Sequence, residues 1–192
     1  MRIVLLGPPG SGKGTKAAML VEHLDLPHIS TGALLRNAAK RGTELGLKAK
    51  AITDKGELVP DKIMSDMIEE RLSRDDVANG FILDGYPRTV AQAESLDVML
   101  KRLGQPADEA ILIDINEEQI IKRIAKRAKK EGRSDDTEET VRNRMRVYRE
   151  QTAPVADYYA QQGVLTRVLG EGKIEEIFQR ILSVINLNAK IA

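Results

Sequence analysis

Short apolar segments alternate along this chain with longer stretches in which apolar residues recur at helical spacing. The short segments have the composition expected of strands that are covered on both faces. They occupy residues 2–6, 28–30, 81–84, 110–115 and 164–169. The helical stretches include residues 16–21, 61–72 and 174–185, the second of them directly after Pro60. Strands that alternate with helices predict an α/β fold with a parallel sheet and right-handed crossovers.

Two stretches interrupt this alternation. Residues 30–59 contain helix-like pieces that we expect to be broken at Gly42, Gly46 and Gly56. Residues 126–136 are short, charged and glycine-containing. We expect both stretches to be mobile flaps over the carboxyl-terminal edge of the sheet, where α/β proteins bind their ligands.

Composition narrows the class of protein. A chain of 192 residues suits one α/β domain, and its formal charge of +1 gives no general attraction to nucleic acid or membrane. The absence of cysteine excludes disulfides, thiolate catalysis and cysteine-based zinc sites. The first apolar run is too short for a signal peptide, and no run approaches the roughly 20 apolar residues of a membrane span. These features predict a cytoplasmic protein.

The segment Gly7–Thr15, with the sequence GPPGSGKGT, is the strongest chemical signal. It lies between a predicted strand and a predicted helix, so that backbone N–H groups and a helix N-terminus surround one anion. Lys13 supplies a mobile charge for the β- and γ-phosphates. Gly14 stands where the magnesium-binding hydroxyl of G-x-x-x-x-G-K-[ST] is usual, and Thr15 follows it. We interpret the loop as a nucleotide site, with an ordinary glycine-rich turn as the less favoured alternative.

A carboxylate and an arginine follow the strand at 81–84. Asp84 ends this strand, beside the loop that holds Lys13, where it is placed to orient magnesium or its waters. The next residues, Gly85 to Arg88, form a tight turn that directs Arg88 into the same crevice. An Asp-Gly pair is also common in ordinary turns, and its position downstream of a phosphate loop favours the functional interpretation.

Arginines are the second strong signal. Arg123 and Arg127 share one helix face at i, i+4 spacing, and Arg133 follows in the charged loop. The next helix carries Arg142, Arg144, Arg146 and Arg149. A solvated basic face and a nucleic-acid patch are the alternatives. Acidic residues interleave with these arginines, and the chain has only two Phe and no Trp for base stacking, which argues against nucleic acid. Phosphoryl transfer, by contrast, needs several guanidinium groups.

No residue pattern indicates a general base. Transfer to a phosphate acceptor needs none, because the attacking oxygen is already anionic, whereas transfer to a hydroxyl usually employs a carboxylate. His23 and His28 show no partner pattern, and we expect them at a surface helix position and a strand edge.

With these motifs the chain resembles the adenylate kinases, in the short-lid form of the nucleoside monophosphate kinase family, over essentially its whole length. The resemblance rests on residues 7–15, 30–32, 35–36, 57–59, 84–88, 92, 132–136, 139–144 and 152–154. It implies a P-loop NTPase-type parallel sheet of about five strands flanked by helices. It also implies a monophosphate-binding flap (30–59), a short lid (126–136) and a core made of residues 1–29, 60–125 and 137–192.

The resemblance implies which residues hold each nucleotide. For ATP these are Gly10, Ser11, Gly12, Lys13, Gly14 and Thr15, with Arg127 in the lid and the backbone of Gly172 at the adenine. For AMP they are Thr31, Arg36, Glu57, Leu58, Val59, Gly85, Tyr86, Pro87, Arg88 and Gln92, with Arg133 and Arg144. The implied catalytic set is Lys13, Arg88, Arg123, Arg127, Arg133 and Arg144. Ala33 departs from the family, where an acidic residue commonly follows Thr-Gly.

The resemblance further implies Mg²⁺ bound with ATP and reached by Asp84 through water, with no structural zinc. Thr31 and Gln92 favour adenine as the acceptor base, since a glutamine amide can donate to and accept from adenine together. The expected reaction is reversible transfer of the γ-phosphoryl group of Mg·ATP to AMP, giving two ADP, and the expected form is a monomer. A kinase for UMP or CMP is the nearest alternative. A nucleotide-dependent switch is another, although the guanine-reading Asn-Lys-x-Asp pattern is absent.

Overall fold

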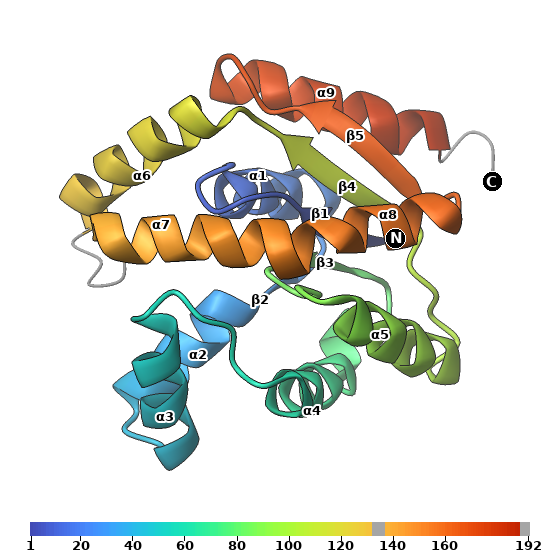
Figure 1. Cartoon of the computed structure of the whole chain (residues 1–192). Coiled ribbons are helices and arrows are strands. Elements are labelled where there is room, and N and C mark those ends of the chain that lie inside the picture. The colour runs from blue at the N-terminus through green and yellow to red at the C-terminus, as the bar shows by residue number, and fades with distance from the viewer. Residues whose placement is uncertain (132–136, 189–192) are drawn as a thin grey trace.

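A parallel β-sheet forms the centre of the molecule in the computed structural model, which describes residues 1–131 and 137–188 (Figure 1). In this part of the chain the sheet has five strands in the order β2-β3-β1-β4-β5, and every neighbouring pair is parallel. The strands are β1 (Arg2–Leu6), β2 (His28–Ser30), β3 (Phe81–Asp84), β4 (Glu109–Asp114) and β5 (Leu165–Leu169). The predicted α/β fold class is confirmed.

Helices connect the strands and cover the sheet. They are α1 (Lys13–Leu24), α2 (Thr31–Lys40), α3 (Glu44–Thr53), α4 (Asp61–Leu72), α5 (Val90–Arg102), α6 (Glu117–Glu131), α7 (Glu138–Val147), α8 (Ala153–Gln161) and α9 (Ile174–Asn188). A π-helical turn, Tyr148–Thr152, joins α7 to α8, and a short 3₁₀ turn, Asp75–Val77, precedes β3. Within the two described ranges, no helix is both long and apolar enough to cross a membrane.

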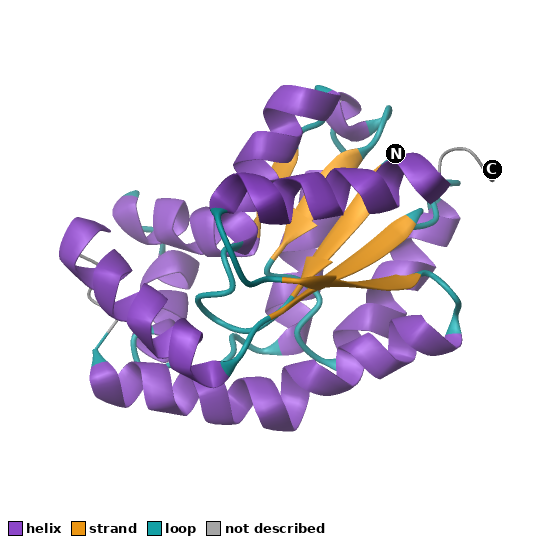
Figure 2. Ribbon diagram, turned by 90° about the horizontal axis from the view of Figure 1, so that it is seen from above, coloured by secondary structure: helices purple, strands orange, loops and turns teal. Residues whose placement is uncertain are grey.

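Alternation of side chains in β1 divides the core into two layers. Ile3 and Leu5 point to one face of the sheet and pack with residues of α1 and α9. Val4 and Leu6 point to the other face, where α4, α5 and α8 contribute the partners. Because successive strand residues face opposite sides, the part of a strand that is buried in both layers must be apolar, as residues 3–6 are. Figure 2 shows the helices on either side of the sheet.

The register of the sheet determines where a ligand site can form. Leu5 of β1 is aligned with Asp84 of β3, so the loop after β1 and the turn after β3 begin side by side. The chain leaves β1 toward β2 on one side of the sheet and leaves β3 toward β4 on the other. Ligands bind at such a switch point, outside the carboxyl ends of the strands.

The predicted flap contains α2 and α3, which project away from the sheet in Figure 1. Gly42 (φ +71°) and Gly56 (φ +78°) lie where helices end, as expected. The predicted break at Gly46 is wrong: this residue lies inside α3. A Cβ at Gly46 would overlap the backbone of Ala38, so glycine here allows α2 and α3 to pack closely.

The predicted lid falls partly outside the described residues. Residues 126–131 continue α6 as a helix, and residues 132–136, including Arg133, lie outside the part of the chain that the structure describes.

Candidate active site

A cleft of about 1470 Å³ opens at the carboxyl ends of the strands. Pockets for single small ligands usually measure about 300–1000 Å³, so this cleft has room for two nucleotides. Its walls come from the loop after β1, the predicted flap, the turn after β3 and the helices α6 and α7.

The loop after β1 has the conformation of a phosphate cradle. Gly12 adopts φ +90° and forms the N-cap of α1, so that the first turn of the helix opens toward the cleft. A side chain is strained at such a φ, which explains glycine at this position. The orphan N–H groups of α1 and its dipole then face the space that an anion occupies.

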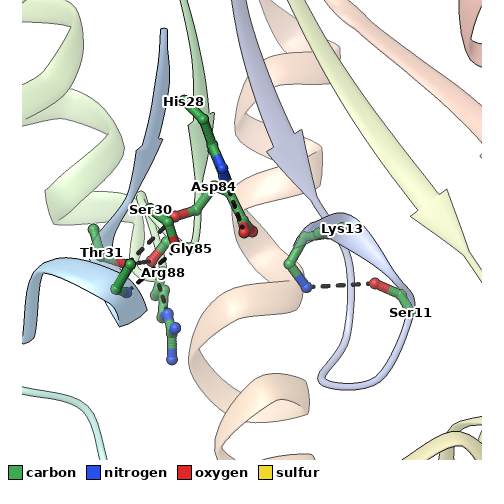
Figure 3. A network of polar contacts seen from close by, with 9 residues as sticks. Ser11, Lys13, His28, Ser30, Thr31, Asp84, Gly85 and Arg88 are labelled. Carbon is green, nitrogen blue, oxygen red and sulfur yellow. Dashed lines mark hydrogen bonds and ion pairs between the residues drawn. The ribbon is translucent and has the colours of Figure 1, made fainter. Parts of the chain in front are cut away.

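Lys13 lies folded against this loop (Figure 3). Its Nζ donates hydrogen bonds to the carbonyl oxygens of Gly7 (2.7 Å) and Pro8 (3.0 Å) and lies 3.4 Å from Ser11 Oγ. Loss of water around the ammonium group lowers the pKa of Lys13 to about 8, with Asp84 opposing the shift and Arg88 adding to it. An arriving phosphate compensates this lost hydration and favours the charged lysine.

Asp84 stands across the cleft floor from Lys13 and has a partner that the sequence did not indicate (Figure 3). Its Oδ2 lies 3.5 Å from Nε2 of His28, which belongs to the edge strand β2. Burial opposes ionisation of Asp84, but His28, Lys13 and Arg88 together lower the pKa of this carboxyl. The contact spans two strands, so no local sequence signal could have revealed it.

The residues near the phosphate loop fit a magnesium ion that arrives with the nucleotide. No group of three or more His, Cys, Asp or Glu side chains that could hold a metal occurs among the residues that the structure describes. A Cβ at Gly14 would lie 3.7 Å from Asp84 Oδ2, which places this carboxylate beside the start of α1. Mg²⁺ typically takes one or two carboxylates, substrate phosphates and several waters, and a single nearby carboxylate matches that demand.

The turn after β3 organises the opposite half of the cleft. Gly85 has φ +83°, and its carbonyl oxygen accepts hydrogen bonds from Thr31 Oγ1 and from Arg88 Nε, both at 2.8 Å. A Cβ on Gly85 would lie 2.6 Å from Thr31 Oγ1, so only glycine permits this approach. The turn therefore ties the beginning of α2 to the arginine that follows β3.

Three guanidinium groups from three separate segments converge here. Arg88 opens onto the cleft, yet the surrounding protein displaces enough water to lower the pKa of its guanidinium group. Asp84 opposes this shift, whereas the positive charges of Arg144 on α7 and Arg36 on α2 add to it. Like charges gathered around one space favour a bound anion, and arginine holds phosphate with two parallel hydrogen bonds.

Gln92 closes the same half of the cleft with a network of hydrogen bonds that includes the carboxylate of Asp61. Its side chain is buried, with Oε1 accepting from the backbone N–H of Arg88 (2.7 Å) and Nε2 donating to Asp61 Oδ1 (2.7 Å). Thr89 Oγ1 donates to Asp61 Oδ2 (3.0 Å) and accepts from the backbone N–H of Gln92 (3.1 Å), which caps α5. Asp61 was not among the predicted site residues, because in the sequence it reads only as the start of a helix.

Comparison with known proteins agrees with this geometry. The family model described as adenylate kinase matches residues 5–164. The chain belongs to the adenylate kinase family. It is 56% identical over 185 residues to the adenylate kinase of Stenotrophomonas maltophilia (strain K279a), covering 96% of this chain and 99% of that protein. It is 55% identical over 181 residues to that of Xanthomonas campestris pv. campestris (strain 8004), covering 94% and 97%.

The resemblance inferred from the motifs is thereby confirmed, and with it the enzyme class. Adenylate kinases convert ATP and AMP to two ADP, and this is the reaction of the chain. The rival interpretation as a nucleotide-dependent switch is set aside.

Most residues expected to bind nucleotides in this adenylate kinase line the cleft. On the donor side these are Gly10, Gly12, Lys13, Gly14, Thr15, Arg123, Arg127 and Gly172. On the acceptor side they are Thr31, Arg36, Glu57, Leu58, Val59, Gly85, Tyr86, Pro87, Arg88, Gln92 and Arg144. Ser11 is different: it is fully buried within the loop.

The remaining arginines divide into two groups. Arg123 donates to the carbonyl oxygens of Ser11 (3.2 Å) and Gly170 (2.9 Å), and so links the phosphate loop to the segment after β5. Other arginines form surface ion pairs with acidic residues, and for them the solvated-face interpretation is correct. These pairs are Arg142–Glu138, Arg146–Glu150 and Arg149–Glu117.

The tip of the predicted flap rests on α7 in this adenylate kinase. Thr140 Oγ1 donates to the carbonyl oxygen of Asp54 (3.0 Å), and Asn143 Nδ2 donates to that of Lys55 (2.6 Å). A Cβ on Gly56 would lie 2.8 Å from the carbonyl oxygen of Thr140, so this glycine also permits close contact. The docked flap brings Arg36 and Arg144 to the same space.

Proposed function

We propose that the cleft holds ATP and AMP at the same time and transfers the terminal phosphoryl group directly between them. The observation that carries this proposal is the position of Arg88. Burial is the main cause of the lowered pKa of Lys13 on the donor side, and the charge of Arg88 adds to it; the pKa of Arg88 is itself lowered by burial, with added effects of Arg144 and Arg36 on the acceptor side. One guanidinium group thus stands where a phosphoryl group in transit carries its charge.

On the donor side, the ATP phosphates bind the backbone N–H groups of residues 10–15. Lys13 exchanges its carbonyl partners, Gly7 and Pro8, for the β- and γ-phosphates. Arg123 and Arg127 add positive charge, and the backbone of Gly172 meets the adenine. Asp84 would hold Mg²⁺ through water, and the ion would supply positive charge to neutralise the ATP phosphates.

On the acceptor side, Arg36, Arg88 and Arg144 hold the AMP phosphate, together with Arg133, which lies outside the described residues. Thr31, Gln92 and the backbone of residues 57–59 hold the nucleoside. The attacking phosphate oxygen is already ionised, so no side chain has to remove a proton. The chain's contribution is alignment of the two phosphates and stabilisation of the moving charge.

We propose that residues 30–59 and 126–136 close over the nucleotides and expel water. Water would otherwise compete with AMP for the phosphoryl group. The hydrogen bonds from α7 to the carbonyl oxygens of Asp54 and Lys55 support a docked position for the first of these segments. Bound phosphates supply the negative charge that draws opposing arginines together.

A panel of acceptors tests the proposal. ADP formation from ATP should depend on added AMP and should fall strongly when UMP or CMP replaces it. The nearest alternative, a pyrimidine monophosphate kinase, predicts the opposite order of acceptors. Release of inorganic phosphate that is independent of any monophosphate would contradict direct transfer.

A cytoplasmic monomer is the form we propose for the working enzyme. Large exposed apolar side chains occur on several separate elements, as is normal for a monomer surface. They are Leu45, Leu47, Val98, Leu103, Ile121, Leu169 and Ile174. Sedimentation analysis at micromolar concentration should give a single species of 21.2 kDa, and a dimer would contradict this proposal.

A further inference from the structure

The side-chain amide of Gln92 is bound at both ends, and this permits only one orientation. The oxygen accepts from the backbone N–H of Arg88 at 2.7 Å, and the nitrogen donates to Asp61 Oδ1 at 2.7 Å. In the reversed orientation, the Gln92 amino group would face the backbone N–H of Arg88, so that two donors meet. The Gln92 oxygen would face Asp61 Oδ1, so that two acceptors meet. Gln92 is only 2% exposed, so water cannot replace the two lost hydrogen bonds.

Each end of this amide keeps capacity for one more hydrogen bond. A carbonyl oxygen has a second lone pair, and an amide nitrogen has a second hydrogen. Gln92 lines the cleft, so the remaining acceptor and donor are available to a base in a fixed order. Adenine offers an amino donor next to a ring-nitrogen acceptor, whereas guanine and hypoxanthine offer a carbonyl acceptor next to an N–H donor. An amide held in one orientation matches the first pattern and opposes the second.

We propose that Asp61 is a positioning residue for base specificity, which it sets by holding the Gln92 amide in the orientation that reads adenine. The inference rests on the proposed function, which places the acceptor base against Gln92. Asp61 does not touch the base in this scheme and acts only through Gln92.

The carboxylate of Asp61 is itself held in place. Its second oxygen accepts from Thr89 Oγ1 at 3.0 Å, so both oxygens have partners on the segment that begins α5. Asp61 is the first residue of α4, and only Pro60 separates it from the predicted flap. The same contacts therefore join the end of the flap to the residue that reads the base. A carboxylate at this position also interacts favourably with the dipole of α4. This is a purely structural role, and a test must distinguish it from positioning of Gln92.

The test compares AMP with IMP, whose hypoxanthine base has similar size but the opposite donor and acceptor order. Asp61→Ala removes the acceptor for Gln92 Nε2, and we expect kcat/KM for AMP to fall about 10-fold, mainly through KM. The ratio of kcat/KM for IMP to that for AMP should rise by about 10-fold, because the freed amide can turn. Asp61→Asn keeps an oxygen for Gln92 and can turn its amino group to the Thr89 hydroxyl. This variant should preserve the wild-type ratio within about 3-fold.

A control on the same helix accounts for charge. Asp66 is an exposed carboxylate of α4 whose partner is Lys62, at 2.9 Å, rather than Gln92. Asp66→Ala should leave the ratio unchanged. If Asp61→Ala does not fold, Asp61→Ser gives the same test, because its short hydroxyl cannot reach Gln92 Nε2.

A double-variant cycle separates positioning from structure. In a Gln92→Ala background, Asp61→Ala should produce no further change in the ratio, since the group through which it acts is gone. An Asp61→Ala enzyme that loses activity toward AMP and IMP in equal proportion, or loses only thermal stability, would overturn the inference. In that case the wild-type preference for AMP still stands. Wild-type enzyme that shows no AMP-dependent formation of ADP would instead refute the proposed function.

Discussion

The donor half and the acceptor half of the cleft are built from different parts of the chain. The phosphate-binding part of the donor half is one continuous segment, residues 7–15, to which α6 and the segment after β5 add Arg123, Arg127 and Gly172. The acceptor half joins α2, the turn after β3, the starts of α4 and α5, and α7. The triphosphate group is the same in every nucleoside triphosphate, so backbone N–H groups and positively charged side chains suffice to bind it. Choosing one base requires neutral donors and acceptors with a fixed orientation, and these need support from several segments.

This difference also appears in how the groups are held. The ammonium group of Lys13 shares its hydrogen bonds among three oxygen atoms of its own loop, all within 3.4 Å. Gln92 has one specified partner for each end of its amide. A mobile charge tolerates variation in ligand position, whereas a bound amide does not.

The largest expected effect lies where the two halves meet. Lys13→Ala or Arg88→Ala should lower kcat by at least about 100-fold, because each group faces charge that develops during transfer. Steady-state kinetics with both substrates saturating measures this. Arg142→Ala, which removes an exposed arginine paired with Glu138, serves as the control and should change little. Wild-type kcat with only raised KM values would show that these residues bind the ground state alone.

A substitution in the acceptor half should act on one substrate only. Gln92→Ala should raise KM for AMP by about 10- to 100-fold, since a matched buried amide is worth about 1–3 kcal/mol. KM for ATP should stay within about 2-fold, because Gln92 and its partners Arg88 and Asp61 belong to the acceptor half. Full titrations of each substrate at saturating levels of the other give the comparison. An equal loss for ATP and AMP would mean that the two halves are not independent, or that Gln92 only supports the fold.

The pH dependence of binding should also differ between the halves. Lys13 has a pKa of about 8 in the free protein. Bound phosphates favour its charged form and raise this pKa, so ATP binding should take up a proton near pH 9 and weaken as pH rises above about 8. Calorimetry between pH 7.5 and pH 9.5, in buffers of different ionisation enthalpy, measures both effects. AMP binding should vary less, and an equal decline for AMP would argue against Lys13 as the titrating group.

The lowered pKa of Lys13 also determines how its contribution to the free energy of unfolding changes with pH. The folded pKa of Lys13 is below the ordinary lysine value of 10.5, so between about pH 8 and pH 10.5 the unfolded chain binds more protons than the folded chain. The contribution of Lys13 to the free energy of unfolding therefore rises with pH across this window. This gain applies to the free protein and should be reduced when ATP is bound.

The smallest expected effect concerns docking of the flap. Asn143→Ala removes the hydrogen bond to the carbonyl oxygen of Lys55, and KM for AMP should rise only about 2- to 5-fold. Hydrogen exchange in residues 30–59 should become faster in the variant, while β1 stays unchanged. A ligand that bridges the ATP and AMP sites should increase protection of residues 30–59 in both proteins. Equal protection with and without that ligand would mean that the segment is a fixed wall.

The sequence was sufficient for the elements and for the phosphate loop of the donor half, because both depend on local patterns. Residues 3–6 of β1 are all apolar because both faces of the strand are buried, and this pattern can be recognised from the sequence alone. The phosphate loop is contiguous, so residues 7–15 show their chemistry together. The helical stripe at residues 61–72 matches α4 in both bounds. At Gly46 the local rule failed, since a glycine required by packing between two helices looks the same as one that ends a helix.

The tertiary structure decided which distant residues become partners. Asp84 lies beside His28 because two parallel strands are aligned, and Asp61 lies beside Gln92 because the starts of α4 and α5 are in contact. Neither partner is within hydrogen-bonding distance in an extended chain, and neither pairing has a characteristic spacing. The sequence by itself determined that this protein binds a nucleotide phosphate on a parallel sheet, because periodicity and a contiguous loop are local properties. Orientation of the residues that select the second substrate is a property of packing between segments, and only the folded structure contains it.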